Sequence, residues 1–175
     1  MKILETWCYC PVCGSPHWER NSVKSMKCHS CGFEYFINPS AANAAFILND
    51  EDKLLVVRRK KEPAKGTLDL PGGFADAGET AEEGVVREVK EETNLDVTEV
   101  KYLFSYPNIY LYSNVELPTQ DIFFLCKVKD TAALQAMDDA CDCQWVSLKD
   151  IHTEQFGLRS VRQGLFEFLE RYSKI

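Results

Sequence analysis

Apolar residues along the chain follow two periods, the short runs typical of strands and the three-to-four spacing typical of helices. Two apolar runs, 41–48 and 53–59, flank the polar segment 49–52 and predict two strands joined by a turn. Further strand-like runs lie at 97–104, 109–115, 121–128 and 143–146. Together with two helical segments, these runs predict a mixed α+β domain.

The two helical segments differ in what their polar faces carry. The first covers about 80–93, opens with Thr80 and Glu83 at a capping-box spacing, and has the apolar stripe Ala81, Val85 and Val89. The second covers about 158–172 and is amphipathic. Its apolar face consists of Leu158, Val161, Leu165, Phe168 and Leu169.

The N-terminal segment is set apart by its cysteines. Four of the eight cysteines form two C-x-x-C pairs, Cys10 with Cys13 and Cys28 with Cys31, separated by 14 residues and each followed by glycine. This spacing is typical of a four-thiolate zinc ribbon, whereas Cys8 fits the knuckle less well as a ligand. We therefore predict a ribbon at 1–38, folded largely by a structural Zn²⁺, and a main domain at 39–175.

Charge and hydropathy narrow the function classes. A net charge of −7 and the lack of a long basic tract argue against a general nucleic-acid binder. No apolar run approaches the ~20 residues of a membrane span, and the N-terminus has no apolar stretch of signal-peptide length. We expect a cytoplasmic protein without a membrane partner. A phosphorylated substrate is compatible with the acidic chain, because a divalent metal supplies positive charge.

Three glutamates on the first helix point to such a metal. Glu88, Glu91 and Glu92 stand at i, i+3 and i+4, so they project within roughly a 100° arc beside the apolar stripe. Like charges at this spacing repel, and a hard cation such as Mg²⁺ or Mn²⁺ reverses that repulsion. A solvated acidic helix face is the simpler alternative. The preceding Gly72-Gly73 pair favours the metal, because it lets backbone polar groups approach a metal or phosphate.

The segment 73–95 closely resembles the Nudix box, G-x5-E-x7-R-E-U-x-E-E-x-G-U, in which U is a bulky aliphatic residue. Gly73, Glu79 and the run REVKEETNL from Arg87 to Leu95 fit every position except one. Asn94 replaces the glycine that ends the helix, and asparagine is the next best residue for a left-handed conformation.

The resemblance implies a Nudix α/β/α sandwich around a mixed sheet and a metal-dependent hydrolase of nucleoside diphosphates linked to another moiety. By the same similarity, Glu88, Glu91 and Glu92 would hold Mg²⁺ or Mn²⁺, with the Gly72 carbonyl as a further ligand. Arg87 and Glu79 would shape the site. The general base stays open among Glu91, Glu92 and an acid from a later loop.

A zinc ribbon before a Nudix box is similar to the NADH pyrophosphatase group, which also carries a motif S-Q-P-W-P-F-P-x-S after the box. In residues 105–113, Ser105, Pro107 and Ser113 agree and Tyr110 keeps an aromatic ring, but the tryptophan and two prolines are replaced. This run is either a substrate-specificity loop or a tyrosine-rich strand in the core or a dimer interface.

Two further residues are assigned from this resemblance. Asp142 lies where such enzymes often carry a glutamate near the metals, although taken alone it is more often a solvated acid. Phe74 lies where a residue stacks on a nucleobase. Relatives in this group often form homodimers with the ribbon near the interface, and we extend that expectation to this chain.

The first functional hypothesis is a pyrophosphohydrolase that uses a metal-activated water, with NAD(H) as the leading substrate ahead of ADP-ribose-like compounds and nucleoside triphosphates. The alternative is a non-catalytic nucleotide sensor that uses the ribbon for partner contact. The intact glutamates favour the enzyme. Arg20, Lys24 and Lys27 in the ribbon leave an RNA contact open, and an NAD-capped RNA end would suit both halves of the chain.

Overall fold

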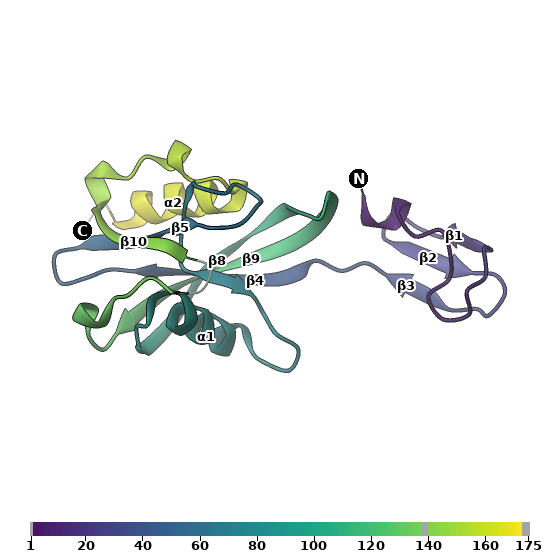
Figure 1. Cartoon of the computed structure of the whole chain (residues 1–175), viewed down its shortest axis with the longest axis horizontal. Helices are drawn as coiled ribbons and strands as arrows, with labels where there is room; N and C mark the ends of the chain where they lie inside the picture. The colour runs from purple at the N-terminus through teal and green to yellow at the C-terminus, as the bar shows by residue number, and fades with distance from the viewer. Residues whose placement is uncertain (1, 138–139, 173–175) are drawn as a thin grey trace.

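The computed structural model describes residues 2–137 and 140–172 and shows a small N-terminal ribbon beside a larger domain (Figure 1). The ribbon contains the 3₁₀ turn η1 (Ile3–Glu5) and the strands β1 (Trp18–Arg20), β2 (Ser25–Cys28) and β3 (Glu34–Phe36). These strands form an antiparallel sheet in the order β1-β2-β3. Only a small core is buried here, consisting of Leu4, Cys10, Trp18, Met26 and Cys28. A core this small needs a further stabilising element, which the cysteines can supply through a metal.

The larger domain is built on two sheets. The four-stranded mixed sheet has the order β7-β4-β9-β8, in which β4 and β9 are parallel and the other pairs antiparallel. The three-stranded sheet is antiparallel in the order β10-β5-β6. The strands are β4 (Ser40–Ile47), β5 (Lys53–Arg59), β6 (Leu68–Asp69), β7 (Gly72–Phe74), β8 (Val97–Tyr112), β9 (Val115–Val128) and β10 (Ala140–Ser147).

The helices α1 (Ala81–Thr93) and α2 (Arg159–Tyr172) lie on opposite sides of these sheets (Figure 1). Alternate residues of β4 face the two helices, since Phe46 belongs to the core under α2 and Ile47 to the core under α1. Phe46 stacks on Phe168 of α2 with ring centroids 4.0 Å apart, and Val85 and Val89 of α1 are fully buried. The predicted α/β/α sandwich with a mixed sheet is confirmed. Three short 3₁₀ turns complete the chain, η2 (Thr131–Ala133), η3 (Leu148–Asp150) and η4 (Thr153–Gln155).

The segment 97–128 differs from the prediction of three separate strands. It forms one long hairpin, β8 and β9, whose turn is at Ser113–Asn114, both with positive φ. The predicted strand 109–115 therefore crosses the turn, and residues 105–112 continue β8. Pro107 is tolerated because β8 is at the edge of its sheet, where a missing N–H need not break a ladder hydrogen bond. Residues 105–112 therefore form a strand and not a loop, whereas a role of this run in substrate binding stays a prediction.

The ends of α1 follow the sequence signals. The Thr80 hydroxyl accepts from the Glu83 amide at 3.1 Å, and the Glu83 carboxylate accepts from the Thr80 amide at 2.8 Å. At the other end Asn94 is left-handed, with φ 61°, and its amide donates to the Lys90 carbonyl. The predicted capping box and the helix-ending role of Asn94 are both confirmed.

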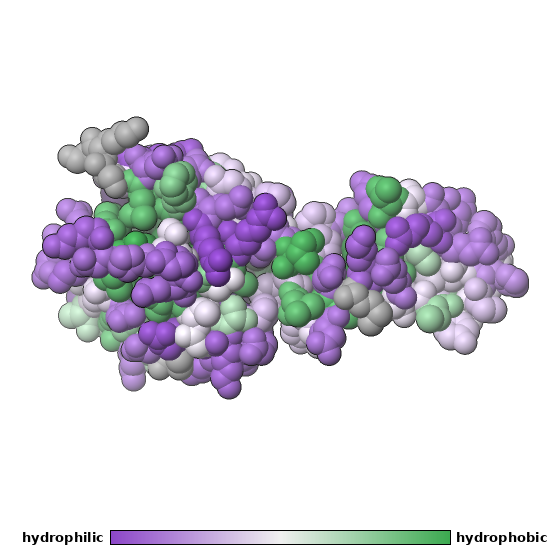
Figure 2. Space-filling model, turned by 90° about the horizontal axis from the view of Figure 1, so that it is seen from above, coloured by the Kyte–Doolittle hydropathy of each residue, from purple (hydrophilic) through white to green (hydrophobic). Residues whose placement is uncertain are grey.

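The surface is largely hydrophilic on the face shown in Figure 2, with apolar patches between the larger domain and the ribbon. The hairpin end of β8 carries three exposed apolar side chains, Ile109, Leu111 and Tyr112. The first ribbon residues reach this hairpin, because Lys2 forms a parallel bridge with Glu116 of β9. The boundary between residues 38 and 39 stays a prediction. Within the described residues, no helix has the length and apolar character needed to cross a membrane.

The conformation of Asn94 leads to a stability prediction. Asn94→Ala should lower the free energy of unfolding by about 1 kcal/mol, because alanine pays the steric cost of the left-handed region. Asn94→Gly should stay within a few tenths of a kcal/mol of the parent, because glycine adopts that region freely. Urea unfolding followed by circular dichroism measures both values. Equal stability of the two variants would contradict the role assigned to the cap.

Candidate functional site

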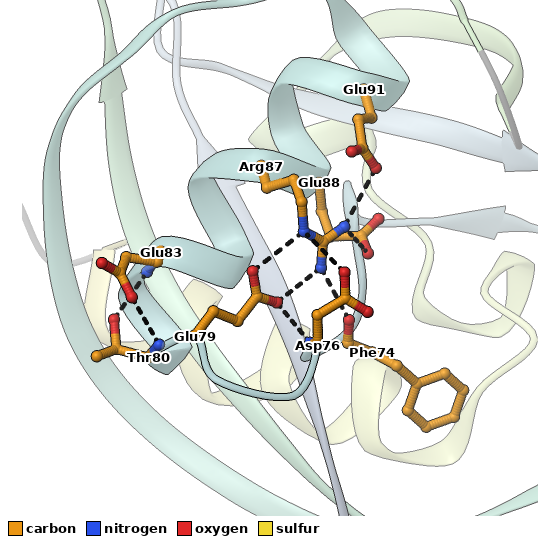
Figure 3. Close-up of polar contacts among 8 residues, drawn as sticks. All are labelled: Phe74, Asp76, Glu79, Thr80, Glu83, Arg87, Glu88 and Glu91. Atoms are coloured by element: carbon orange, nitrogen blue, oxygen red, sulfur yellow. Dashed lines mark hydrogen bonds and ion pairs between the residues drawn. The ribbon is translucent and has the colours of Figure 1, made fainter.

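The Arg87 guanidinium is the centre of a cluster of carboxylates on and before α1 (Figure 3). Its Nε and Nη2 donate to the two oxygens of Glu79 at 3.1 and 2.7 Å. Its Nη1 donates to Glu88 at 2.8 Å and to Glu91 at 3.1 Å. Asp76 approaches Nε to 3.7 Å, and the Phe74 carbonyl accepts from Nη2 at 3.1 Å. One cation therefore orients four acidic side chains and the end of β7.

The charges in this cluster do not balance. Four carboxylates lie within 4 Å of one guanidinium, which leaves a surplus of negative charge. Hydrogen bonds from Arg87 lower the pKa of Glu79, whereas burial raises the pKa of Glu88 despite the opposing effect of Arg87. The hydrogen bonds to Glu79 and Glu88 in turn raise the pKa of Arg87, so the guanidinium stays charged. The cluster therefore carries net negative charge.

Two glycines let β7 approach its neighbours closely, Gly72 the backbone of β4 and Gly73 the Glu88 side chain of α1. The Gly72 amide donates to Glu92 at 3.0 Å, and Glu92 is 8% exposed. A Cβ on Gly72 would lie 2.0 Å from the Asn43 carbonyl oxygen, and φ there is +152°. A Cβ on Gly73 would lie 2.6–2.7 Å from the carboxylate atoms of Glu88. Gly73 therefore leaves the space that the Glu88 carboxylate occupies.

A cavity of about 440 Å³ opens beside these groups. Glu88, Glu92, Gly72 and Gly73 line one part of it. Other described residues that line it are Ala42, Ala44, Val57, Leu70, Phe123, Leu158 and Val161 on apolar walls, and Lys60, Lys61, Glu62 and Asp76 among the polar groups. The cavity is large enough for a nucleotide-sized group.

A second part of the cavity wall joins a charged pair to an aromatic pair. Arg59 and Asp69 form an ion pair of 2.6 Å, and Arg59 also donates to the Tyr110 hydroxyl at 3.0 Å. The Tyr110 ring meets the Phe74 ring edge to face, with centroids 5.3 Å apart. All four side chains belong to residues that line the cavity. Burial raises the pKa of Asp69, and the charge and hydrogen bond of Arg59 oppose that rise.

A buried carboxylate also reaches the cavity from β9. Asp121 is 7% exposed and accepts from Asn108 at 3.1 Å, from Thr119 at 2.6 Å and from Ser160 at the start of α2. These neutral donors satisfy the carboxylate and tie the long hairpin to α2. Asp121 therefore has a clear structural role where the two layers meet.

The residues predicted from the sequence fall into two groups. Glu79, Glu88 and Glu91 gather around Arg87, while Glu92 is bonded instead to the Gly72 amide. The Glu91 side chain is 48% exposed. Of the predicted substrate contacts, Phe74 and Tyr110 line the cavity.

Three predicted residues lie elsewhere. Ser105 and Pro107 pair with Ile122 and Gln120 along the β8–β9 ladder, and neither is among the residues lining the cavity. Asp142 is exposed on β10 opposite Arg58 and is likewise outside the lining.

Sequence reasoning missed Arg59, Asp69 and Asp121. Arg59 and Asp69 did carry a signal, because each ends or interrupts an apolar run, KLLVVRR and LDL. A charge in a buried strand needs a partner. The identity of that partner depends on the pairing of β5 with β6, which no local pattern specifies.

The ribbon brings its four predicted ligands together. One ligand atom from each of Cys10, Cys13, Cys28 and Cys31 lies within 4.8 Å of the others, and in the described part of the chain this is the one cluster compact enough to suggest a metal site. Cys8 is exposed, and its sulfur contacts the Thr6 carbonyl. Four convergent thiols suit Zn²⁺, whereas carboxylate oxygens such as those on α1 are the kind of donor that a hard cation prefers.

Comparisons with known proteins agree with this geometry. The NUDIX domain family model matches residues 38–170. The chain therefore belongs to the Nudix hydrolase family, which confirms the resemblance seen in residues 73–95. Its fold is similar to that of a NUDIX hydrolase from Nitrosomonas europaea, with a TM-score of 0.75 and 21% identity over 96% of this chain and 93% of that one.

Two curated relatives are similar in sequence. An ADP-ribose pyrophosphatase from Methanocaldococcus jannaschii is 35% identical over 122 residues, 68% of each chain. An NAD-capped RNA hydrolase NudC from Pseudomonas entomophila is 29% identical over 172 residues. That match covers 94% of this chain, including most of the ribbon, but only 58% of the relative.

The contact between Gly73 and Glu88 can be tested. Gly73→Ala should displace the Glu88 carboxylate, which is the flexible end of its side chain, so the fold should persist while Mn²⁺ affinity and turnover fall by about tenfold or more. Mn²⁺ binding followed by electron paramagnetic resonance, together with the melting temperature, separates the two effects. Unchanged Mn²⁺ affinity would show that this contact does not shape the site.

The cysteine cluster leads to a second prediction. The purified protein should contain about one zinc per chain, and Cys10→Ala with Cys28→Ala should abolish it and unfold the ribbon. Elemental analysis measures the metal, and Cys8→Ala is the matched control because that thiol lies outside the cluster. Full zinc content in the double variant would rule out the four-cysteine site.

Proposed function

We propose that this protein is a metal-dependent pyrophosphohydrolase that cleaves the diphosphate of a nucleoside diphosphate-linked compound. The observation that carries the proposal is the position of the Arg87 carboxylate cluster at the edge of a cavity with an aromatic wall. The diphosphate of such a compound would lie near the carboxylate cluster, and its planar ring would lie in the cavity beside the aromatic wall. Membership of the Nudix hydrolase family supports the same reaction.

The negative surplus around Arg87 supports a divalent cation. Glu88, Glu91 and Glu92, with the Gly72 carbonyl, are the residues proposed to hold Mg²⁺ or Mn²⁺. A metal ion bound there supplies positive charge to the diphosphate and lowers the pKa of a coordinated water. Without this charge, the acids would repel the substrate.

The chain's own residues orient the carboxylates and exclude water from the cavity. Arg87 fixes Glu79, Glu88 and Glu91 by hydrogen bonds of 2.7–3.1 Å, so these carboxylates need little reorganisation when a ligand arrives. Glu92 is held by the Gly72 amide, which fixes its position relative to β7. The apolar cavity walls exclude water from the bound organic group. Proton acceptance is proposed for Glu91, Glu92 or an acid of a later loop.

Among the substrates, NAD(H) stays the leading proposal. The similarity to the Pseudomonas entomophila NAD-capped RNA hydrolase extends over most of the ribbon as well as the Nudix domain. ADP-ribose is the second candidate, favoured by the Methanocaldococcus jannaschii relative, which has the higher identity. An NAD-capped RNA end is a further candidate through the same diphosphate. A homodimer and a cytoplasmic location stay predictions.

A product assay with Mg²⁺ or Mn²⁺ tests the reaction. NADH, NAD⁺, ADP-ribose, an NAD-capped RNA and the nucleoside triphosphates should be offered in parallel. We expect AMP plus a nicotinamide mononucleotide product from the dinucleotides. Preference for ADP-ribose would keep the chemistry and change the substrate, whereas nucleotide binding without cleavage of any compound would favour the sensor alternative.

Two variants give this assay its controls. Glu91→Gln should reduce turnover by at least about a hundredfold, because it removes a charged group that the proposal places at the metal. Glu82→Gln removes an exposed carboxylate from the first turn of the same helix and should leave turnover within about threefold of the parent. Similar turnover in the two variants would refute the assignment of the metal site.

A further inference from the structure

Arg59 links the two sheets at the wall of the cavity. Its side chain is 17% exposed and comes from the end of β5, in the three-stranded sheet. Three of its nitrogen atoms donate to different partners: Nε to the Pro63 carbonyl at 2.8 Å, Nη1 to Asp69 at 2.6 Å and Nη2 to the Tyr110 hydroxyl at 3.0 Å. Tyr110 belongs to β8, in the four-stranded sheet. The guanidinium thus bridges two separately paired parts of the fold.

The hydrogen bond from Arg59 ends on Tyr110, one ring of the aromatic pair Phe74 and Tyr110. Tyr110 is near the hairpin end of β8, where its neighbours Ile109 and Leu111 are exposed. Its hydroxyl accepts a hydrogen bond from Arg59, and its ring makes an edge-to-face contact with Phe74 at the cavity wall. The Arg59 carbon Cζ also lies 5.9 Å from the centre of the Tyr110 ring. Phe74 is 37% exposed and lines the cavity, so part of its side chain can contact a ligand there.

We propose that Arg59 is a positioning residue for substrate recognition, which holds Tyr110 against Phe74 and so sets the width of a subsite for a planar aromatic ring. The proposal rests on the proposed function and specifies the part of the substrate that this wall recognises. The ligand chemistry is a flat heteroaromatic ring attached to a ribose phosphate. Either end of a dinucleotide supplies such a ring, so adenine and nicotinamide are the two sources to distinguish.

The shape of the guanidinium explains why arginine occupies this position. Its planar fork donates in three directions at once, whereas a lysine ammonium is a point charge on a flexible stem. Arg59→Lys therefore keeps a positive charge for the buried Asp69 but cannot keep all three bonds. Truncation to alanine would instead leave the Asp69 carboxylate buried without its partner, and the variant could fail to fold. Lysine is the informative substitution.

Steady-state kinetics with NADH and with diribosyl diphosphate test the positioning role of Arg59. NADH carries rings at both ends, and diribosyl diphosphate has the same diphosphate linkage without rings. Arg59→Lys should raise KM for NADH about tenfold, in the range expected for loss of a base-stacking contact, and leave kcat within about threefold. Both parameters for diribosyl diphosphate should stay unchanged. Tyr110→Phe should act in the same direction, because it keeps the ring and removes the hydroxyl bond.

The matched control is Arg58→Lys. It makes the same substitution one residue earlier on β5, at a side chain that donates to the Gly66 carbonyl and is not among the residues lining the cavity. It should leave KM for NADH unchanged. If Arg59→Lys also leaves KM for NADH unchanged, or weakens both substrates equally, the positioning role is overturned.

Binding without metal separates this proposal from the proposed function. Calorimetry with AMP, nicotinamide mononucleotide and ribose 5-phosphate needs no turnover. The parent should bind at least one ring-bearing ligand more tightly than ribose 5-phosphate, and Arg59→Lys should lower the affinity for that ligand about tenfold. The ligand whose affinity falls shows whether the subsite takes adenine or nicotinamide. Such a result without hydrolysis of any substrate would refute the enzyme and keep the subsite, whereas equal binding of all three ligands by the parent would overturn the subsite.

Discussion

One guanidinium determines how the acidic groups of this protein are arranged. Arg87 is bonded to Glu79, Glu88 and Glu91 and also to the backbone of Phe74, so it fixes α1, the loop before it and the end of β7 relative to one another. Without that cation, carboxylates at successive turns would repel and turn towards solvent. Because four carboxylates surround one guanidinium, the cluster keeps a net negative charge, on which the proposed divalent cation site depends.

The sheets place this cluster next to a space that can hold an organic group. Gly72 allows β7 to approach β4 and Gly73 allows it to approach α1, while β5 and β6 belong to a second sheet whose residues line the same cavity. The contact of Arg59 with Tyr110 links the two sheets beside the cavity, whereas its contact with Asp69 lies within the three-stranded sheet.

The ribbon has a much smaller apolar core than the larger domain. Its buried apolar side chains are few, and two of the cluster's cysteines are themselves part of that small core. The larger domain instead has two extensive cores on the faces of its sheets, under α1 and α2. The two parts of the chain therefore differ in how much apolar surface they bury, and stabilisation of the ribbon by metal-bound thiolates stays a prediction.

The sequence alone determined the features that depend on residues close together in the chain. The spacing of Glu88, Glu91 and Glu92, the caps at Thr80 and Asn94, and the paired cysteines all follow from helical or turn geometry over a few residues. The tertiary structure decided what depends on strand pairing. The joining of β8 and β9 into one hairpin, the exclusion of Ser105 and Pro107 from the cavity, and the contact of Arg59 with Tyr110 are of this kind. Residues 59 and 110 meet because two sheets pack together, and that packing depends on burial summed over the whole domain, which no local pattern records.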